Sequence, residues 1–110
     1  MKNLRNRVQL IGNLGNTPEI KETTAGKKYV RLSLATNHIF INKEGEKTKD
    51  TQWHNIITWG KQAEIADKYL SKGQEICIEG KLNYRTYQDN NGDNKYVHEI
   101  IAHELLMLKN

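Results

Sequence analysis

Four large aromatic side chains stand at positions suited to binding flat ligands. Trp53 and Trp59 are six residues apart in a β-prone stretch, so a regular strand would point both to the same side. Phe40 follows an apolar alternating stretch, and Tyr87 ends another, each beside a polar segment. Aromatic rings stack on unpaired nucleobases, and each such contact contributes ~1–3 kcal/mol. These residues are therefore candidates for base stacking.

Basic residues surround these aromatic residues. The chain has 17 Lys and Arg against 13 Asp and Glu, which gives a net charge of +4. Cations interleaved with aromatic rings favour a single-stranded nucleic acid, because every nucleotide offers both a base and a phosphate. The basic residues that we expect to contact phosphates are Arg5, Arg7, Lys28, Arg31, Lys43, Lys49, Lys61, Lys81 and Arg85.

Catalytic and metal-binding patterns are weak by comparison. The four histidines, His38, His54, His98 and His103, are scattered along the chain, without a His-Glu-x-x-His motif or a partner at ligand spacing. The single cysteine, Cys77, permits no internal disulfide and no thiolate cage. The sequence thus predicts a protein that is not an enzyme and that needs neither a metal nor another cofactor.

The expected elements are mostly strands. Val30, Leu32 and Leu34 alternate with polar neighbours, which is typical of a half-buried strand. Polar segments that contain glycine, at 42–50 and 88–94, predict exposed hairpin loops. The predicted strands cover residues 8–14, 29–36, 51–59, 75–87 and 95–108.

One helix is expected between the third and fourth strands. Apolar residues fall on one helical face over residues 61–70, and Gly73 supplies the expected stop. Three strands, one helix and two strands suit an all-β, closed five-stranded Greek-key barrel of the OB-fold type, as a single domain over residues 1–110. The expected aliphatic core contains Val30, Leu32, Leu34, Ile76, Ile78 and Leu82.

The tryptophans could themselves belong to that core. Ile56 and Thr58 lie on the opposite side of the third strand from Trp53 and Trp59, and the pattern alone leaves open which side faces inward. Context favours outward tryptophans, because other strands already offer aliphatic core residues.

Short motifs are spread along nearly the whole chain. They are VQLIGNLG at 8–15, PE at 18–19, LAT at 34–36, WH at 53–54, GK at 60–61, AE at 63–64, Ala66, YL at 69–70, KG at 72–73 and IEGKL at 78–82. Together, in this order and at this spacing, these motifs resemble the bacterial single-stranded DNA-binding protein family.

The resemblance implies an OB barrel that binds and protects single-stranded DNA without sequence preference in replication, recombination and repair. Phe40, Trp53, Trp59 and Tyr87 match the stacking positions of the family, although tryptophan is common at the first and last of them. The resemblance also implies a homotetramer, with a dimer as the alternative. The residues implied at or near subunit contacts are Val8, Leu10 and His54.

The ends of the chain carry further expectations. The family usually continues through a flexible linker to an acidic tip that recruits replication and repair proteins, whereas this sequence ends at residue 110 without one. Two explanations stay open, a truncated sequence and a naturally tailless version of the plasmid or phage type, and without a tail we expect such recruitment to be poor. No secretory signal or membrane-spanning stretch is expected, so the protein should stay in the cytoplasm at the nucleoid.

Two other functional classes fit the sequence less well. A related dimeric primosome-type adaptor would lack most of the stacking set, which this chain keeps. A metal-dependent nuclease would need a carboxylate or histidine motif that the sequence does not show.

Overall fold

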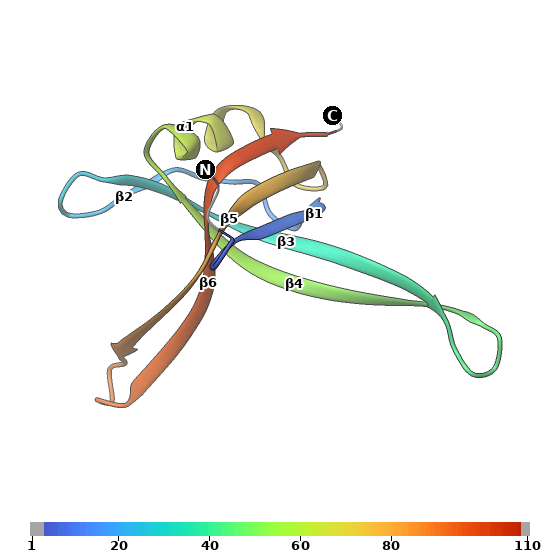
Figure 1. The fold of residues 1–110 in the computed structure, drawn as a ribbon. Helices are drawn as coiled ribbons and strands as arrows, with labels where there is room; N and C mark the ends of the chain where they lie inside the picture. Colours follow the sequence, from blue (N-terminus) through green and yellow to red (C-terminus); the bar gives the residue numbers. More distant parts are fainter. Residues whose placement is uncertain (1–3, 109–110) are drawn as a thin grey trace.

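The computed structural model describes residues 4–108 and is shown in Figure 1. The elements in order are β1 (Val8–Leu14), β2 (Lys21–Glu22), β3 (Lys28–Ile41), β4 (Lys47–Trp59), α1 (Gly60–Tyr69), β5 (Glu75–Gln88) and β6 (Asn94–Met107). The predicted single domain over residues 1–110 includes residues 1–3 and 109–110, which lie outside the described residues. No helix within the described part is long and apolar enough to cross a membrane.

Five long strands close into a barrel. Their order is β1-β5-β6-β4-β3, and β1 also pairs with β3, which completes the circle. The short β2 adds to the free side of β3. The helix follows the third long strand, β4, and covers one end of the barrel in Figure 1. This confirms the predicted OB-fold barrel with one helix between its third and fourth strands.

Alternation along the strands fills the interior. Val30, Leu32 and Leu34 of β3 are buried, as are Ile76 and Ile78 of β5. Helix α1 adds the buried side chains of Ala63 and Ala66, and Leu70 follows them into the core. The backbone of Leu70, the C-cap residue, is extended, so the helix ends at Tyr69. Gly73 lies in the next turn and is not the stop that the sequence suggested.

Two glycines allow the barrel to close. A Cβ atom on Gly12 would lie 2.2 Å from the carbonyl oxygen of Ala35, where β1 leaves β5 and meets β3. A Cβ atom on Gly80 would lie 2.0 Å from the carbonyl oxygen of Ile101, at an irregularity in the β5–β6 pairing. Backbone approaches of this kind leave no room for a side chain.

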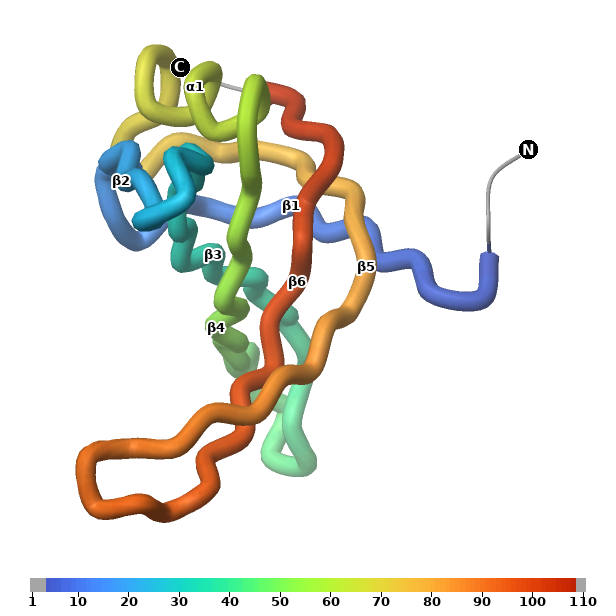
Figure 2. The backbone as a smooth tube through the Cα atoms, turned by 90° about the vertical axis from the view of Figure 1, so that its left-hand side faces the viewer, coloured from blue at the N-terminus to red at the C-terminus, as the bar shows by residue number. Residues whose placement is uncertain are grey.

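Two hairpins extend well beyond the barrel, as Figures 1 and 2 show. We call them the β3–β4 arm (residues 36–52) and the β5–β6 arm (residues 82–100). β3 and β4 stay paired from Tyr29 opposite Trp59 to Ile41 opposite Lys47. The predicted loop at 42–50 was therefore too long, because residues 47–50 belong to β4. Leu82, which was predicted to be core, is 45% exposed because it lies at the base of the β5–β6 arm.

Candidate nucleic-acid interface

One face of the sheet carries most of the predicted site. The register pairs Tyr29 with Trp59 and Ala35 with Trp53, so both tryptophans share the outer face of β3 and β4. Ile56 and Thr58 on the alternate positions are buried, which settles the direction that the sequence left open. Trp53 is 62% exposed and Trp59 is 39% exposed.

The outer face continues across β6 onto β5. Ile57 of β4 pairs with Ile101 of β6, which in turn pairs with Lys81 of β5. Alternation along β5 then places Arg85 and Tyr87 on the same face as Lys81. Tyr87 is 48% exposed. We call this continuous surface the outer face: Tyr29, Arg31, Trp53, Trp59, Lys81, Arg85, Tyr87 and Glu99.

Aromatic and basic groups contact one another along the outer face. The rings of Tyr29 and Trp59 have centroids 5.2 Å apart and are tilted by 41°. The guanidinium of Arg31 lies 5.8 Å from the centroid of the Tyr29 ring. Arg31 also forms an ion pair with Glu99 of β6, and Glu99 forms a second ion pair with Arg85 of β5. Aromatic planes and cations are thus arranged along one path that crosses four strands, β3, β4, β6 and β5.

A pocket opens at the end of this path, beside Trp59. It has a volume of about 410 Å³ and is lined by Gly26, Lys27, Lys28, Trp59 and Gly60. The ammonium of Lys28 lies 3.5 Å from the carboxylate of Glu64, and both side chains are about half exposed. A ring face flanked by two ammonium groups suits a base together with its phosphate.

Trp53 lies against a glycine. A Cβ atom on Gly15 would lie 2.5 Å from Cζ3 of the Trp53 ring. The amide N–H of Gly15 donates to the carbonyl oxygen of Ser33, 2.8 Å away. The ring of Trp53 therefore lies against Gly15, and a larger residue at position 15 would displace the ring.

Phe40 is placed differently from the other three aromatic residues. The unbroken register of the β3–β4 arm puts Phe40 opposite Thr48, on the alternate face from Trp53. Phe40 is 40% exposed, and its ring stacks on that of His38 at a centroid distance of 5.8 Å. The structure thus exposes all four predicted rings, but only three of them share the outer face.

The predicted phosphate-contacting residues also fall into groups. Arg31 and Arg85 meet at Glu99, and Lys28 lines the pocket beside Trp59. Arg7 instead forms an ion pair with Glu79, which also meets His103. The remaining members, Arg5, Lys43, Lys49, Lys61 and Lys81, are exposed.

The residues expected near subunit contacts are less exposed. Val8 and Leu10 are partly buried and pack against the core. His54 is half-buried, and its Nε2 lies 2.9 Å from the hydroxyl of Thr36. No grouping of three His, Cys, Asp or Glu side chains suited to a metal ion occurs between residues 4 and 108.

Sequence reasoning missed several residues. Tyr29 lies two positions before Arg31, so strand alternation could have identified it. Tyr84 and Tyr96 are 67% and 73% exposed on the other face of the β5–β6 arm. Glu99 gave no sequence signal, because its two arginine partners are 68 and 14 residues away.

Residues 5–108 match the model of the single-strand binding protein family. A "Single-stranded DNA-binding protein 1" from Chlorobaculum tepidum is 45% identical over 104 residues, which are 94% of this chain and 64% of that protein. A single-stranded DNA-binding protein from Xanthomonas campestris is 44% identical over 103 residues, 94% of this chain and 60% of that protein. The chain thus spans about three fifths of the length of these relatives.

Solved structures give the same result. A structure described as a Plasmodium falciparum SSB complex with ssDNA superposes with a TM-score of 0.85 and is 32% identical, covering 99% of each chain. A deletion mutant of the single-stranded DNA-binding protein from Thermus aquaticus has a TM-score of 0.82 and is 30% identical, covering 96% of this chain and 51% of that one. The chain belongs to the single-strand binding protein family.

Proposed function

We propose that this protein binds and protects single-stranded DNA without sequence preference, in replication, recombination and repair, and that it is not an enzyme. The observation that carries the proposal is the outer face. Trp53, Trp59 and Tyr87 are exposed there and share the face with Arg31 and Arg85. Stacking on rings is insensitive to base identity, because every base has a π-face. Family membership and the two superposed structures support the same function.

Binding would combine two contributions. Trp53, Trp59 and Tyr87 would stack on bases, each contributing ~1–3 kcal/mol, and Phe40 would add a further ring on the β3–β4 arm. Basic residues would neutralise phosphates and release the counterions condensed on the strand. The second contribution makes the affinity depend on salt.

A fluorescence titration with oligo-dT tests this proposal. We expect the strand to quench tryptophan emission, because Trp53 and Trp59 are exposed on the outer face. Raising the salt concentration should weaken the binding. Duplex DNA should compete poorly, because its bases are already stacked, and oligo-U as a competitor reports the preference for DNA over RNA. Absence of quenching at low salt, or equal competition by duplex DNA, would contradict the proposal.

We further propose that the protein assembles as a homotetramer in the cytoplasm. The support on this chain is an apolar row across three strands, in which Ile11 of β1 pairs with Cys77 of β5 and Cys77 pairs with Leu106 of β6. Ile11 and Leu106 are 52% and 61% exposed. Apolar side chains grouped on one exposed sheet face are typical of an interface between subunits.

A further inference from the structure

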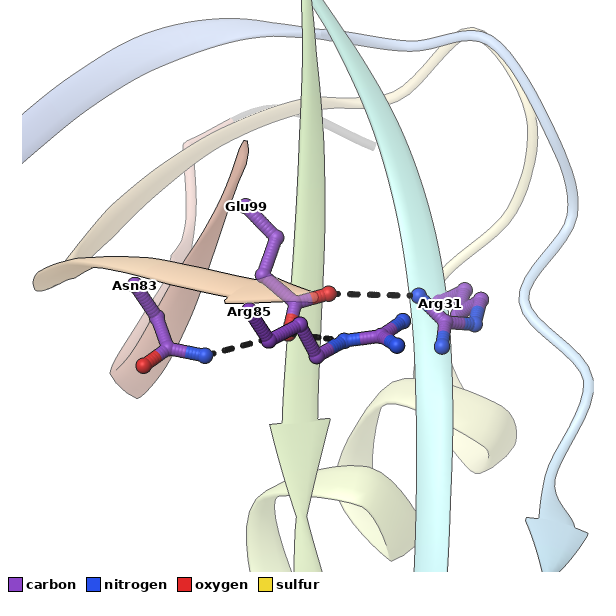
Figure 3. A network of polar contacts seen from close by, with 4 residues as sticks. All are labelled: Arg31, Asn83, Arg85 and Glu99. Atoms are coloured by element: carbon purple, nitrogen blue, oxygen red, sulfur yellow. Dashed lines mark hydrogen bonds and ion pairs between the residues drawn. The ribbon is translucent and has the colours of Figure 1, made fainter. Parts of the chain in front are cut away.

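A buried carboxylate lies in the middle of the outer face. Glu99 of β6 is only 5% exposed. One of its oxygens accepts a hydrogen bond from Nε of Arg85 at 3.1 Å and another from Nδ2 of Asn83 at 3.3 Å. The other oxygen accepts one from Nη1 of Arg31 at 3.4 Å. Figure 3 shows that the donors come from β3 on one side and β5 on the other.

A negative charge at this place needs a physical reason. The outer face is proposed to bind a polyanion, and a carboxylate among its cations lowers the positive potential there. Burial of a charge is also unfavourable unless it is paired and hydrogen-bonded. Glu99 meets that condition, because two guanidinium groups and one amide donate to it.

Among the contacts within residues 4–108, those with Glu99 use only part of each guanidinium group. Arg85 uses Nε for Glu99, so both of its terminal nitrogens remain without a hydrogen-bond partner among the described residues. Arg31 uses one terminal nitrogen, Nη1, for Glu99, and its guanidinium lies by the ring of Tyr29. The two side chains are 50% and 41% exposed, for Arg31 and Arg85 respectively. The planar fork of a guanidinium matches two oxygens of a phosphate when it is presented in this way.

We propose that Glu99 is a positioning residue of the DNA-binding surface, which holds Arg31 and Arg85 so that their outward N–H groups meet phosphates of the bound strand. This inference rests on the proposed function. The carboxylate also offsets the repulsion between the two guanidinium groups. It restricts the rotamers of both arginines, which binding would otherwise have to restrict. One anion thereby serves two cations from separate strands.

Replacement of Glu99 by glutamine distinguishes positioning from a plain charge effect. Glu99→Gln keeps the size of the side chain and removes the charge. If Glu99 only lowered the local potential, this variant would bind oligo-dT more tightly. If Glu99 positions the arginines, we expect about tenfold weaker binding, because two side chains lose their fixed orientation. The dependence of affinity on salt should also become shallower, because fewer phosphates are neutralised.

Glu64→Gln is the matched control. It is the same chemical change in the exposed pair with Lys28, so loss of a carboxylate there should leave the affinity equal or slightly higher. Equal or tighter binding by Glu99→Gln, as in the control, would overturn the inference. Weaker binding by Glu99→Gln alone would support it.

Arg85→Lys keeps the test decisive if Glu99→Gln fails to fold. This variant retains Glu99 and the positive charge but lacks the guanidinium fork. Binding several-fold weaker than in the unaltered protein, at an unchanged melting temperature, supports positioning, whereas unchanged binding overturns it. The unaltered protein is titrated in parallel. If the unaltered protein does not bind oligo-dT, the proposed function itself is wrong. If the unaltered protein binds and Glu99→Gln binds more tightly, only the role of Glu99 is rejected.

Discussion

At the scale of single residues, ring area and placement should rank the stacking contributions. Trp53→Ala and Trp59→Ala should each weaken oligo-dT binding more than Phe40→Ala, because indole offers the larger stacking surface and Phe40 lies off the outer face. We expect losses of ~1–3 kcal/mol for each tryptophan and less for Phe40. Because each of the first two changes removes one of the two tryptophans, the binding is measured by the anisotropy of labelled oligo-dT. Equal losses at all three positions would contradict the ranking.

Gly15 should matter through the ring that rests on it. Its φ is not positive, so alanine fits the backbone, but the new Cβ would displace the Trp53 ring from a position 2.5 Å away. Gly15→Ala should therefore lose part of the ~1–3 kcal/mol that a stacked base contributes. In the Trp53→Ala background the same change should cost nothing further, because two residues that act through one contact are not additive. A full additional loss there would show that Gly15 acts by another route.

At the scale of elements, the close approach at Gly80 should control the stability of the barrel. Gly80→Ala would place a Cβ atom 2.0 Å from the backbone oxygen of Ile101, so β5 and β6 must separate. We expect a loss of unfolding free energy of ~2 kcal/mol or more, measured by urea denaturation. Gly45→Ala is the control. It also replaces a glycine, one with a φ of 78° and open space around it, and should lose only ~1–2 kcal/mol from the backbone conformation. A smaller loss for Gly80→Ala than for Gly45→Ala would contradict the steric argument.

The elements also show which parts of the fold a sequence can predict. Strands with one buried face were predicted well, because Val30, Leu32 and Leu34 alternate with polar neighbours. The β3–β4 arm has water on both faces, so residues 47–50 lack alternation and looked like loop. Leu82 looked like core because its environment depends on where β5 leaves the barrel, after the irregularity at Gly80.

The site was predictable to a similar degree. The exposed rings followed from residue type and spacing, and the resemblance added their roles. Glu99 did not follow, because a glutamate in a strand usually faces water and nothing local marks this one as buried. Its burial depends on side chains from β3 and β5 that only the closed barrel brings to it.

At the scale of the whole molecule, the arms dominate the shape. The radius of gyration is 16.1 Å, whereas about 13 Å is typical of a compact chain of this length. The longest dimension is 54 Å against 37 and 33 Å for the others. The arms thereby carry Phe40 and Tyr87 outward, which lengthens the path that a bound strand can follow.

Assembly should be governed by the apolar row through Ile11, Cys77 and Leu106. Leu106→Glu places a charge on a side chain that is 61% exposed in the single chain, and burying that charge at an interface is unfavourable. We expect the mass by light scattering to be about four times the 12.8 kDa of one chain, and to fall in the variant.

Leu82→Glu, the same change on the β5–β6 arm, should leave the mass unaltered. An unchanged mass in Leu106→Glu would show that copies meet elsewhere. A dimer with weak DNA binding would instead favour the adaptor class of protein.

The circular order of the strands has a consequence for synthesis of the protein. β1 pairs with β5 over six residues but with β3 over only two, so its main partner is made long after it. The N-terminus of a nascent chain leaves the ribosome first. The β3–β4 hairpin can then form locally as soon as it emerges. The barrel cannot close until β5 and then β6 follow, because β5 pairs with β1 and β6 joins β5 to β4. The first strand to be translated is therefore among the last to be fixed, and the nascent chain leaves Val30 and Leu34 open to water, and to chaperones, until most of the protein has been made.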